Sequence, residues 1–346
     1  MTEHNPHLTR RVMLGALPLV ALTACSGNSW TAGGSPEPSN NTDGGAPART
    51  TATPTPTPTL SAAPRYVPQA GEVEPQCKAA AVAAFAAALT VSPPQSAAAA
   101  ASRVTTVGGE GRIGKALQPF LQDCVASTVR VIYPQYGGLS DNLDTASVMV
   151  VAEQIYLTAS DNTPQSRELA VDMRLTRSGG TWRATQALVP QTPPAKPPLS
   201  EAAVRLLENA KVILPGPARA DVAGGVIDEK MLQLLLALSV KWRFHVQVLR
   251  SGHPVNVFGT KRKSNHTLGR AVDIWAIDGI PVIDRLRCDW EAVMREADGL
   301  GATEIGGPAI PDGRKPPGSY FTNLVHQDHL HLAFDPISGS SVTPAT

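Results

Sequence analysis

The stretch Ser264-Asn265-His266-Thr267-Leu268-Gly269-Arg270-Ala271-Val272-Asp273 decides how the C-terminal part of the chain is understood. It places the imidazole of His266 seven residues before the carboxylate of Asp273, with a glycine and a small residue between them. Both side chains can reach one ion, at about 2.0–2.2 Å, only if the connecting turn is tight and carries little bulk near the metal. The stretch therefore predicts two ligands of a zinc site.

A second group of imidazoles follows in His326-Gln327-Asp328-His329-Leu330-His331. Two imidazoles and one carboxylate form a common catalytic zinc set, in which the fourth position stays open to water. All eight histidines of the chain lie either in the first seven residues or after position 244. Any one of them alone is best explained as a hydrogen-bonded core residue, but the set together favours zinc binding.

The pattern S-x-H-x-x-G-x-A-x-D followed by H-x-H resembles the zinc peptidases of the D-Ala-D-Ala carboxypeptidase and murein endopeptidase group, whose fold is shared with hedgehog signalling domains. This resemblance implies that His266, Asp273 and His331 are the zinc ligands. It implies peptidoglycan stem peptides as the substrate. For the fold it implies an α+β domain of the hedgehog/DD-peptidase type, with helices packed on a small antiparallel sheet.

The general base is assigned from the second histidine group. Side chains alternate along a strand, so His329 faces the same way as His331 and Asp328 faces the opposite way. The carboxypeptidases carry Glu and Trp where this chain has Asp328 and Leu330, whereas the penicillin-insensitive murein endopeptidases resemble H-x-x-H-x-H, which begins here at His326. We expect His329 to be the general base, and Asp328 is the alternative.

The resemblance also suggests residues that hold the substrate. Arg250 and Ser264 match polar positions with that role in the family, and His326 belongs to the same group. A guanidinium suits a carboxylate or a carbonyl because it donates two parallel hydrogen bonds. The alternative, weighed equally, is that Arg250 is an ordinary surface arginine with no role in substrate binding.

The N-terminus carries a targeting signal. Arg10-Arg11 precedes a short apolar run that ends at Leu22-Thr23-Ala24-Cys25. The run is too short to span a bilayer, and its end resembles the bacterial lipoprotein box, in which the cysteine is lipidated after cleavage. We expect residues 1–25 to be a lipoprotein signal with Cys25 as the lipid site, exported by the general or the twin-arginine route. An ordinary cleaved signal is the alternative.

Residues 26–70 consist largely of Ser, Thr, Pro, Gly and Asn, and too few of them are apolar to form a core. This segment is expected to be a disordered stalk. A lipid anchor with such a stalk would hold the folded part at the outer face of the cell membrane, in the cell-wall space.

Residues 71–190 are expected to form a middle α+β domain. It opens with an alanine-rich helix at 77–89, and residues 169–176 alternate as a half-buried strand does. Helices followed by a curved antiparallel sheet resemble the cone-shaped fold of nuclear transport factor and ketosteroid isomerase relatives. No acid–base set is visible, so we expect a spacer or an interaction module whose partner is unknown. In an exported protein Cys77 and Cys124 are expected to form a disulfide, with two buried free thiols as the alternative.

A proline-rich linker at 191–198 precedes the predicted peptidase domain at 199–346. The domain is expected to have helices at 201–210, 228–241 and 284–299, and strands at 212–214, 244–249, 271–277, near 305 and at 329–334. Ser200 and Asp228 are the predicted caps of the first two helices.

Net charge is +1 and only 17% of residues are charged, so nothing indicates nucleic-acid binding. The sequence favours an exported, lipid-anchored zinc peptidase, and it leaves carboxypeptidase and endopeptidase activity open. The alternative is a non-catalytic, zinc-stabilised module that binds the cell wall or a protein.

Overall fold

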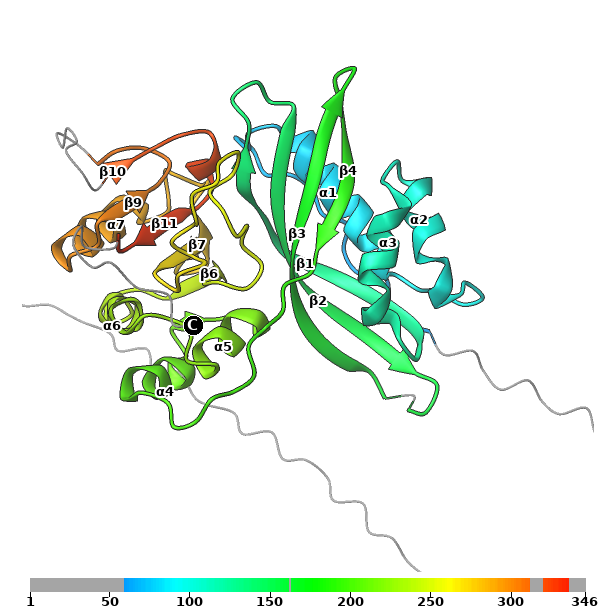
Figure 1. Cartoon of the computed structure of the whole chain (residues 1–346), viewed down its shortest axis with the longest axis horizontal. Helices are drawn as coiled ribbons and strands as arrows, with labels where there is room; N and C mark the ends of the chain where they lie inside the picture. Colours follow the sequence, from blue (N-terminus) through cyan, green and yellow to red (C-terminus); the bar gives the residue numbers. More distant parts are fainter. Residues whose placement is uncertain (1–58, 162, 312–319, 336–346) are drawn as a thin grey trace, which may run out of the picture. The chain divides into compact units, whose positions relative to one another are not determined.

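The computed structural model describes residues 59–161, 163–311 and 320–335 (Figure 1). The predicted signal segment, Cys25 and the stalk up to residue 58 lie outside these residues. The described chain is of the α+β class, with two sheets and two separate hydrophobic cores. We call residues 59–190 the N-terminal lobe and residues 199–335 the C-terminal lobe. No helix in these described ranges has the length and apolar character needed to cross a membrane.

The N-terminal lobe is built on a four-stranded antiparallel sheet in the order β1-β2-β3-β4. The strands are β1 (Cys124–Leu139), β2 (Thr145–Thr158), β3 (Gln165–Ser178) and β4 (Thr181–Leu188). The helices are α1 (Pro75–Leu89), α2 (Ala100–Thr106) and α3 (Gly111–Leu117), with short 3-10 helices η1 (Ala97–Ala99) and η2 (Gln118–Leu121). The helices lie together against the sheet (Figure 1), so the predicted order of helices followed by antiparallel strands is confirmed.

Strand β1 presents different side chains to its two sides, as alternation along a strand requires. Tyr136 is part of the core under the helices and donates its hydroxyl hydrogen to the carbonyls of Val73 and Glu74. Tyr133 and Gln135 instead contact the C-terminal lobe: the ring of Tyr133 stacks on Trp275 with centroids 4.8 Å apart. Strand β1 therefore belongs to one core and reaches the other lobe.

The predicted disulfide between Cys77 and Cys124 is not formed in the structure, where both are buried free thiols. The two sulfur atoms contact different residues. Cys77 lies in α1, with its sulfur close to Tyr136, whereas the thiol of Cys124 donates to the carbonyl of Phe120 at 3.6 Å. Burial raises the pKa of the Cys77 thiol to about 12, so it stays protonated.

The C-terminal lobe has a mixed sheet in the order β10-β9-β11-β7-β6-β5, with β8 paired to β7. Its strands are β5 (Val212–Ile213), β6 (Phe244–Val248), β7 (Ala271–Ile277), β8 (Ile280–Pro281), β9 (Glu304–Gly306), β10 (Tyr320–Phe321) and β11 (Leu330–Ala333). Its helices are α4 (Glu201–Glu208), α5 (Gly216–Ala223), α6 (Glu229–Leu238), α7 (Trp290–Gly299) and the 3-10 helix η3 (Val325–Gln327).

Three expectations for this lobe need correction. The sheet is not purely antiparallel, because α5 and α6 cross over between β5 and β6 and make that pair parallel, and β9 and β10 are also parallel. Helix α5 was not expected, since it opens with Gly216-Pro217, a pair typical of turns. Helix α7 begins at Trp290 rather than at 284, because turns occupy residues 284–287.

Both predicted helix caps are confirmed. The Ser200 side chain accepts a hydrogen bond from the backbone N–H of Ala203, and the Asp228 side chain accepts one from Lys230. Each cap satisfies an N–H group that has no partner within its helix. The apolar residues of α4 and α6 then pack into the core of this lobe, which also contains residues of β6, β7 and β11.

The two lobes are joined by buried polar contacts and by close backbone packing. Gln247 of β6 donates its side-chain amide to the carbonyls of Tyr133 and Met149, both at 2.9 Å. A Cβ atom placed on Gly138 of β1 would lie 2.1 Å from the ring of Phe258, so only glycine permits this approach. These contacts bring β1 beside the residues that the sequence analysis selected as the site.

Candidate metal centre

Three ligand-type side chains are brought together by the pairing of β7 with β11. Asp273 on β7 and His331 on β11 are directly opposite each other in the antiparallel register. His266 lies in the turn just before β7, where the N–H of Gly269 donates to the His266 carbonyl at 2.9 Å. Residues opposite each other on one face of a sheet are close enough to share a ligand. The structure therefore assembles the three residues that the sequence predicted as ligands.

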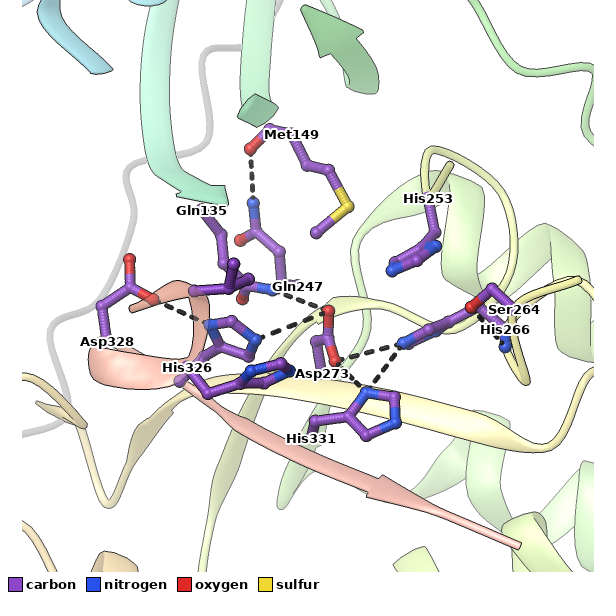
Figure 2. A network of polar contacts seen from close by, with 12 residues as sticks. Gln135, Met149, Gln247, His253, Ser264, His266, Asp273, His326, Asp328 and His331 are labelled. Atoms are coloured by element: carbon purple, nitrogen blue, oxygen red, sulfur yellow. Dashed lines mark hydrogen bonds and ion pairs between the residues drawn. The ribbon is translucent and has the colours of Figure 1, made fainter. Parts of the chain in front are cut away.

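The three candidate ligand atoms form a small triangle (Figure 2). His266 Nε2 lies 3.1 Å from Asp273 Oδ1 and 3.2 Å from His331 Nδ1, and His331 Nδ1 lies 3.0 Å from Asp273 Oδ1. Ligand atoms of a tetrahedral zinc ion with bonds of about 2.0–2.1 Å are separated by roughly 3.3 Å. The spacing is thus close to the one that a bound zinc ion would impose.

The hydrogen bonding of His266 leaves its Nε2 able to bind a cation. Its Nδ1 lies 2.6 Å from the carbonyl oxygen of Leu249, which can only accept a hydrogen bond. The proton of the neutral ring is therefore on Nδ1, and Nε2 directs a lone pair at the carboxylate of Asp273. A backbone carbonyl on the far nitrogen is a usual way to orient a histidine ligand. A positive ion would satisfy the lone pairs that meet here.

His253 is a fourth imidazole at this centre and was not predicted as a ligand. Its ring stacks on that of His266 with centroids 3.9 Å apart, and its Nδ1 donates to the Pro254 carbonyl at 2.8 Å. Candidate ligand atoms of His253, His266 and Asp273 lie within 4.8 Å of one another, so this buried group could hold a metal ion. The signal in the sequence was a histidine directly after Arg250-Ser251-Gly252, at the end of β6.

The electrostatics support a buried anion surrounded by imidazoles. Burial raises the pKa of Asp273, but the imidazoles of His266 and His329 outweigh burial and hold the pKa well below its ordinary value. Burial lowers the pKa of His253 well below 6.5, which keeps that ring neutral and able to bind a metal. Burial also lowers the pKa of His331, but the hydrogen bond to Asp273 and the charge of that carboxylate outweigh burial and raise it. The centre therefore offers an ionised carboxylate and, in His253, a neutral imidazole, and a zinc ion that binds His331 Nδ1 must displace a proton from it.

His329 lies beside the triangle without being part of it. Its Nδ1 is 2.7 Å from Asp328 Oδ1, and its Nε2 is 4.0 Å from Asp273 Oδ2. Because a carboxylate only accepts, Nδ1 carries the proton of the neutral ring and Nε2 is free to accept one. Asp328 itself is buried away from the triangle and pairs with Lys78 of α1.

A cavity of about 280 Å³ adjoins the centre and has walls from both lobes. Among the predicted substrate-binding residues, Ser264 and His326 line it and Arg250 does not. Arg250 donates from Nε to the carbonyl of Thr267 at 3.3 Å, so it stabilises the turn that carries His266. Arg262, in the basic run Lys261-Arg262-Lys263, does line the cavity, and so do residues 136–139 of β1.

No family model matches this chain, and neither a search of curated proteins nor a search of solved structures found a match. Any function must therefore be argued from the side chains of the site and their geometry.

The first prediction concerns metal content. Wild-type protein should bind one zinc ion per chain, and a His266→Ala, His331→Ala double variant should bind none, because it loses two of the three closest ligand atoms. Zinc that binds only the folded state should stabilise wild type by about 2.7 kcal/mol at a hundredfold excess over the dissociation constant. Metal analysis and unfolding with and without zinc measure both effects. Full zinc occupancy of the double variant would rule out this ligand set.

The second prediction concerns the turn between the ligands. Gly269 has φ +70°, and a Cβ atom there would lie 2.1 Å from the carbonyl oxygen of Val226. Gly279→Ala is the matched control, since Gly279 has φ +80° with no atom within 4 Å of its Cβ position. Both variants carry a left-handed penalty of about 1–2 kcal/mol. In urea unfolding Gly269→Ala should lose more stability than Gly279→Ala, and only Gly269→Ala should bind zinc more weakly than wild type. Equal losses of stability in the two variants would contradict this account.

Proposed function

We propose that this chain is a zinc-dependent peptidase that hydrolyses peptide bonds next to D-amino acids in the stem peptides of peptidoglycan. The observation that carries the proposal is the position of His329. Its Nε2 lies beside the Asp273 carboxylate, its Nδ1 is held by Asp328, and its ring lines the cavity. A purely structural metal site needs no such oriented imidazole next to an open cavity.

The chain's own residues supply the proton transfers of hydrolysis. His329 Nε2 takes a proton from the attacking water as the water oxygen bonds to the scissile carbonyl carbon. The same nitrogen then gives that proton to the leaving amine when the carbon–nitrogen bond breaks. Asp328 stabilises the charged ring between the two steps. Zinc at the centre would supply a Lewis acid for the carbonyl and lower the pKa of water towards neutrality.

The substrate class rests on two supports. The first is the resemblance of S-x-H-x-x-G-x-A-x-D and H-x-x-H-x-H to the murein peptidases. The second is the cavity, where Arg262 offers a guanidinium and Ser264 and His326 offer polar groups to a peptide. Arg262 replaces Arg250 as the candidate for binding a peptide carboxylate or carbonyl. Carboxypeptidase and endopeptidase activity both fit this cavity.

The cellular place in the proposal comes from the sequence. A lipid on Cys25 and the Pro/Thr-rich stalk would tether the enzyme at the outer face of the cell membrane, within reach of the cell wall. The membrane contact of the chain is then this lipid anchor.

The third prediction tests the role of His329. His329→Ala should keep its zinc and its fold but lose roughly 10²–10⁴ in the rate of muropeptide hydrolysis, because a general base is removed. His245→Ala is the matched control, since His245 lies in the same lobe against Trp275 and does not line the cavity. Release of muropeptides from intact sacculi, followed by mass spectrometry, gives the rates.

Two results would contradict the proposal. If His329→Ala keeps the wild-type rate, another group is the base. If wild-type protein loaded with zinc hydrolyses no muropeptide but binds sacculi, the chain is a zinc-stabilised cell-wall binding module instead.

A further inference from the structure

We propose that the N-terminal lobe supplies two positioning residues to the metal centre, Gln135 from β1 and Lys78 from α1. Gln135 fixes the carboxylate of Asp273, and Lys78 fixes Asp328 and through it His329. The rate effects of this inference rest on the proposed peptidase function, whereas its effect on metal affinity does not. The N-terminal lobe is then part of the site rather than a spacer.

Gln135 controls which oxygen of Asp273 faces the ligands. Its Nε2 donates to Asp273 Oδ2 at 2.7 Å, while Oδ1 is the oxygen close to His266 and His331. This hydrogen bond favours the orientation of the carboxylate in which Oδ1, rather than Oδ2, faces the two ligand nitrogens. Hydrogen bonds of this kind to ligating groups commonly change metal affinity by 10–100-fold.

The position of Gln135 is fixed by both lobes. Gln135 pairs with Met149 on the neighbouring strand β2, and the Met149 carbonyl accepts a hydrogen bond from Gln247 of β6 (Figure 2). The Gln135 side chain is fully buried, yet its Oε1 has no hydrogen-bond partner among the described residues. A buried carbonyl oxygen without a hydrogen bond reduces stability. The side chain keeps this unfavourable position because its Nε2 donates to Asp273.

Lys78 performs the corresponding task for the general base. It is only 1% exposed, its ammonium pairs with Asp328 Oδ2, and Glu72 Oε1 lies 3.4 Å away. Asp328 Oδ1 in turn binds His329 Nδ1 at 2.7 Å. Burial raises the pKa of Asp328, but Lys78 and His329 outweigh burial and bring the pKa to about 2. Lys78 therefore keeps Asp328 ionised and directed at His329.

Core packing alone does not explain these two residues. Each lobe has its own hydrophobic cluster, and Lys78 and Gln135 are polar side chains that are nevertheless buried. A buried ion pair adds little net stability compared with apolar residues of similar size. Both side chains belong to the lobe opposite the ligands. Gln135 ends on the ligand Asp273, and Lys78 ends on Asp328, which holds His329.

The test for Gln135 uses the full chain and zinc alone. Gln135→Leu should weaken zinc binding by roughly 10–100-fold in competition with a chelator. Gln154→Leu is the matched control, because Gln154 is also fully buried in this lobe but bonds to Phe120 and Ser127, away from the site. Unchanged zinc affinity of Gln135→Leu, or an equal loss in the control, would overturn this half of the inference.

The test for Lys78 compares kcat with KM on muropeptides. Lys78→Met should keep zinc and KM but lower kcat by roughly 10–100-fold, since a displaced base acts poorly while the cavity is unchanged. Lys115→Met, at an exposed lysine of α3, should change neither value. An unchanged kcat would overturn the inference, and a raised kcat would show that the lobe obstructs the site.

Failure of the proposed peptidase function can be distinguished from failure of the inference about Gln135 and Lys78. If zinc-loaded wild type hydrolyses no muropeptide, the proposed function fails, while the zinc affinity of Gln135→Leu still decides whether the lobe positions the centre. If Lys78→Met does not fold, the same Gln135→Leu measurement, with its Gln154→Leu control, decides the inference.

Discussion

The carboxylate of Asp273 is the constraint on which the rest of the site depends. One oxygen, Oδ1, lies within 3.1 Å of nitrogens of both His266 and His331, and the other accepts a hydrogen bond from Gln135. A buried ionised carboxylate is costly unless positive charge or hydrogen-bond donors surround it. Here the surrounding groups come from three separate parts of the chain: the amide of Gln135 donates to Oδ2, and a cation held by His266 and His331 would balance the charge at Oδ1. The turn before β7, strand β11 and the remote strand β1 must all be in place for this carboxylate to be satisfied.

The local parts of this arrangement could be predicted from the sequence. A glycine between His266 and Asp273 indicates a tight turn, and Gly269 indeed has a positive φ where a side chain would strike the backbone of Val226. Alternation along a strand predicts His329 on the side of the ligands and Asp328 on the other side. The structure has His329 beside Asp273 and Asp328 paired with Lys78, although both residues precede β11. The helix caps at Ser200 and Asp228 follow from the same kind of short-range chemistry. These predictions needed only neighbours in the sequence.

The remaining parts could not be predicted, because they depend on contacts between distant segments. Lys78 pairs with Asp328 across 250 positions, and Gln135 bonds to Asp273 across 138. Neither residue stands in a recognisable motif, and in the sequence both look like ordinary members of a helix and a strand. His253 was overlooked for a similar reason, since only the packing of the loop after β6 stacks its ring on His266. The parallel pairing of β5 with β6 was hidden by the unexpected helix α5.

The central claim is that one zinc ion is bound by His266, Asp273 and His331, with the Asp273 carboxylate held by Gln135. A crystal structure of the zinc-loaded protein, with anomalous scattering recorded at the zinc edge, tests it most directly. The account predicts one anomalous peak about 2.0–2.2 Å from His266 Nε2, Asp273 Oδ1 and His331 Nδ1, with Gln135 still on Oδ2. A peak bound by His253, His266 and Asp273 without His331, or no peak at this centre, would contradict it.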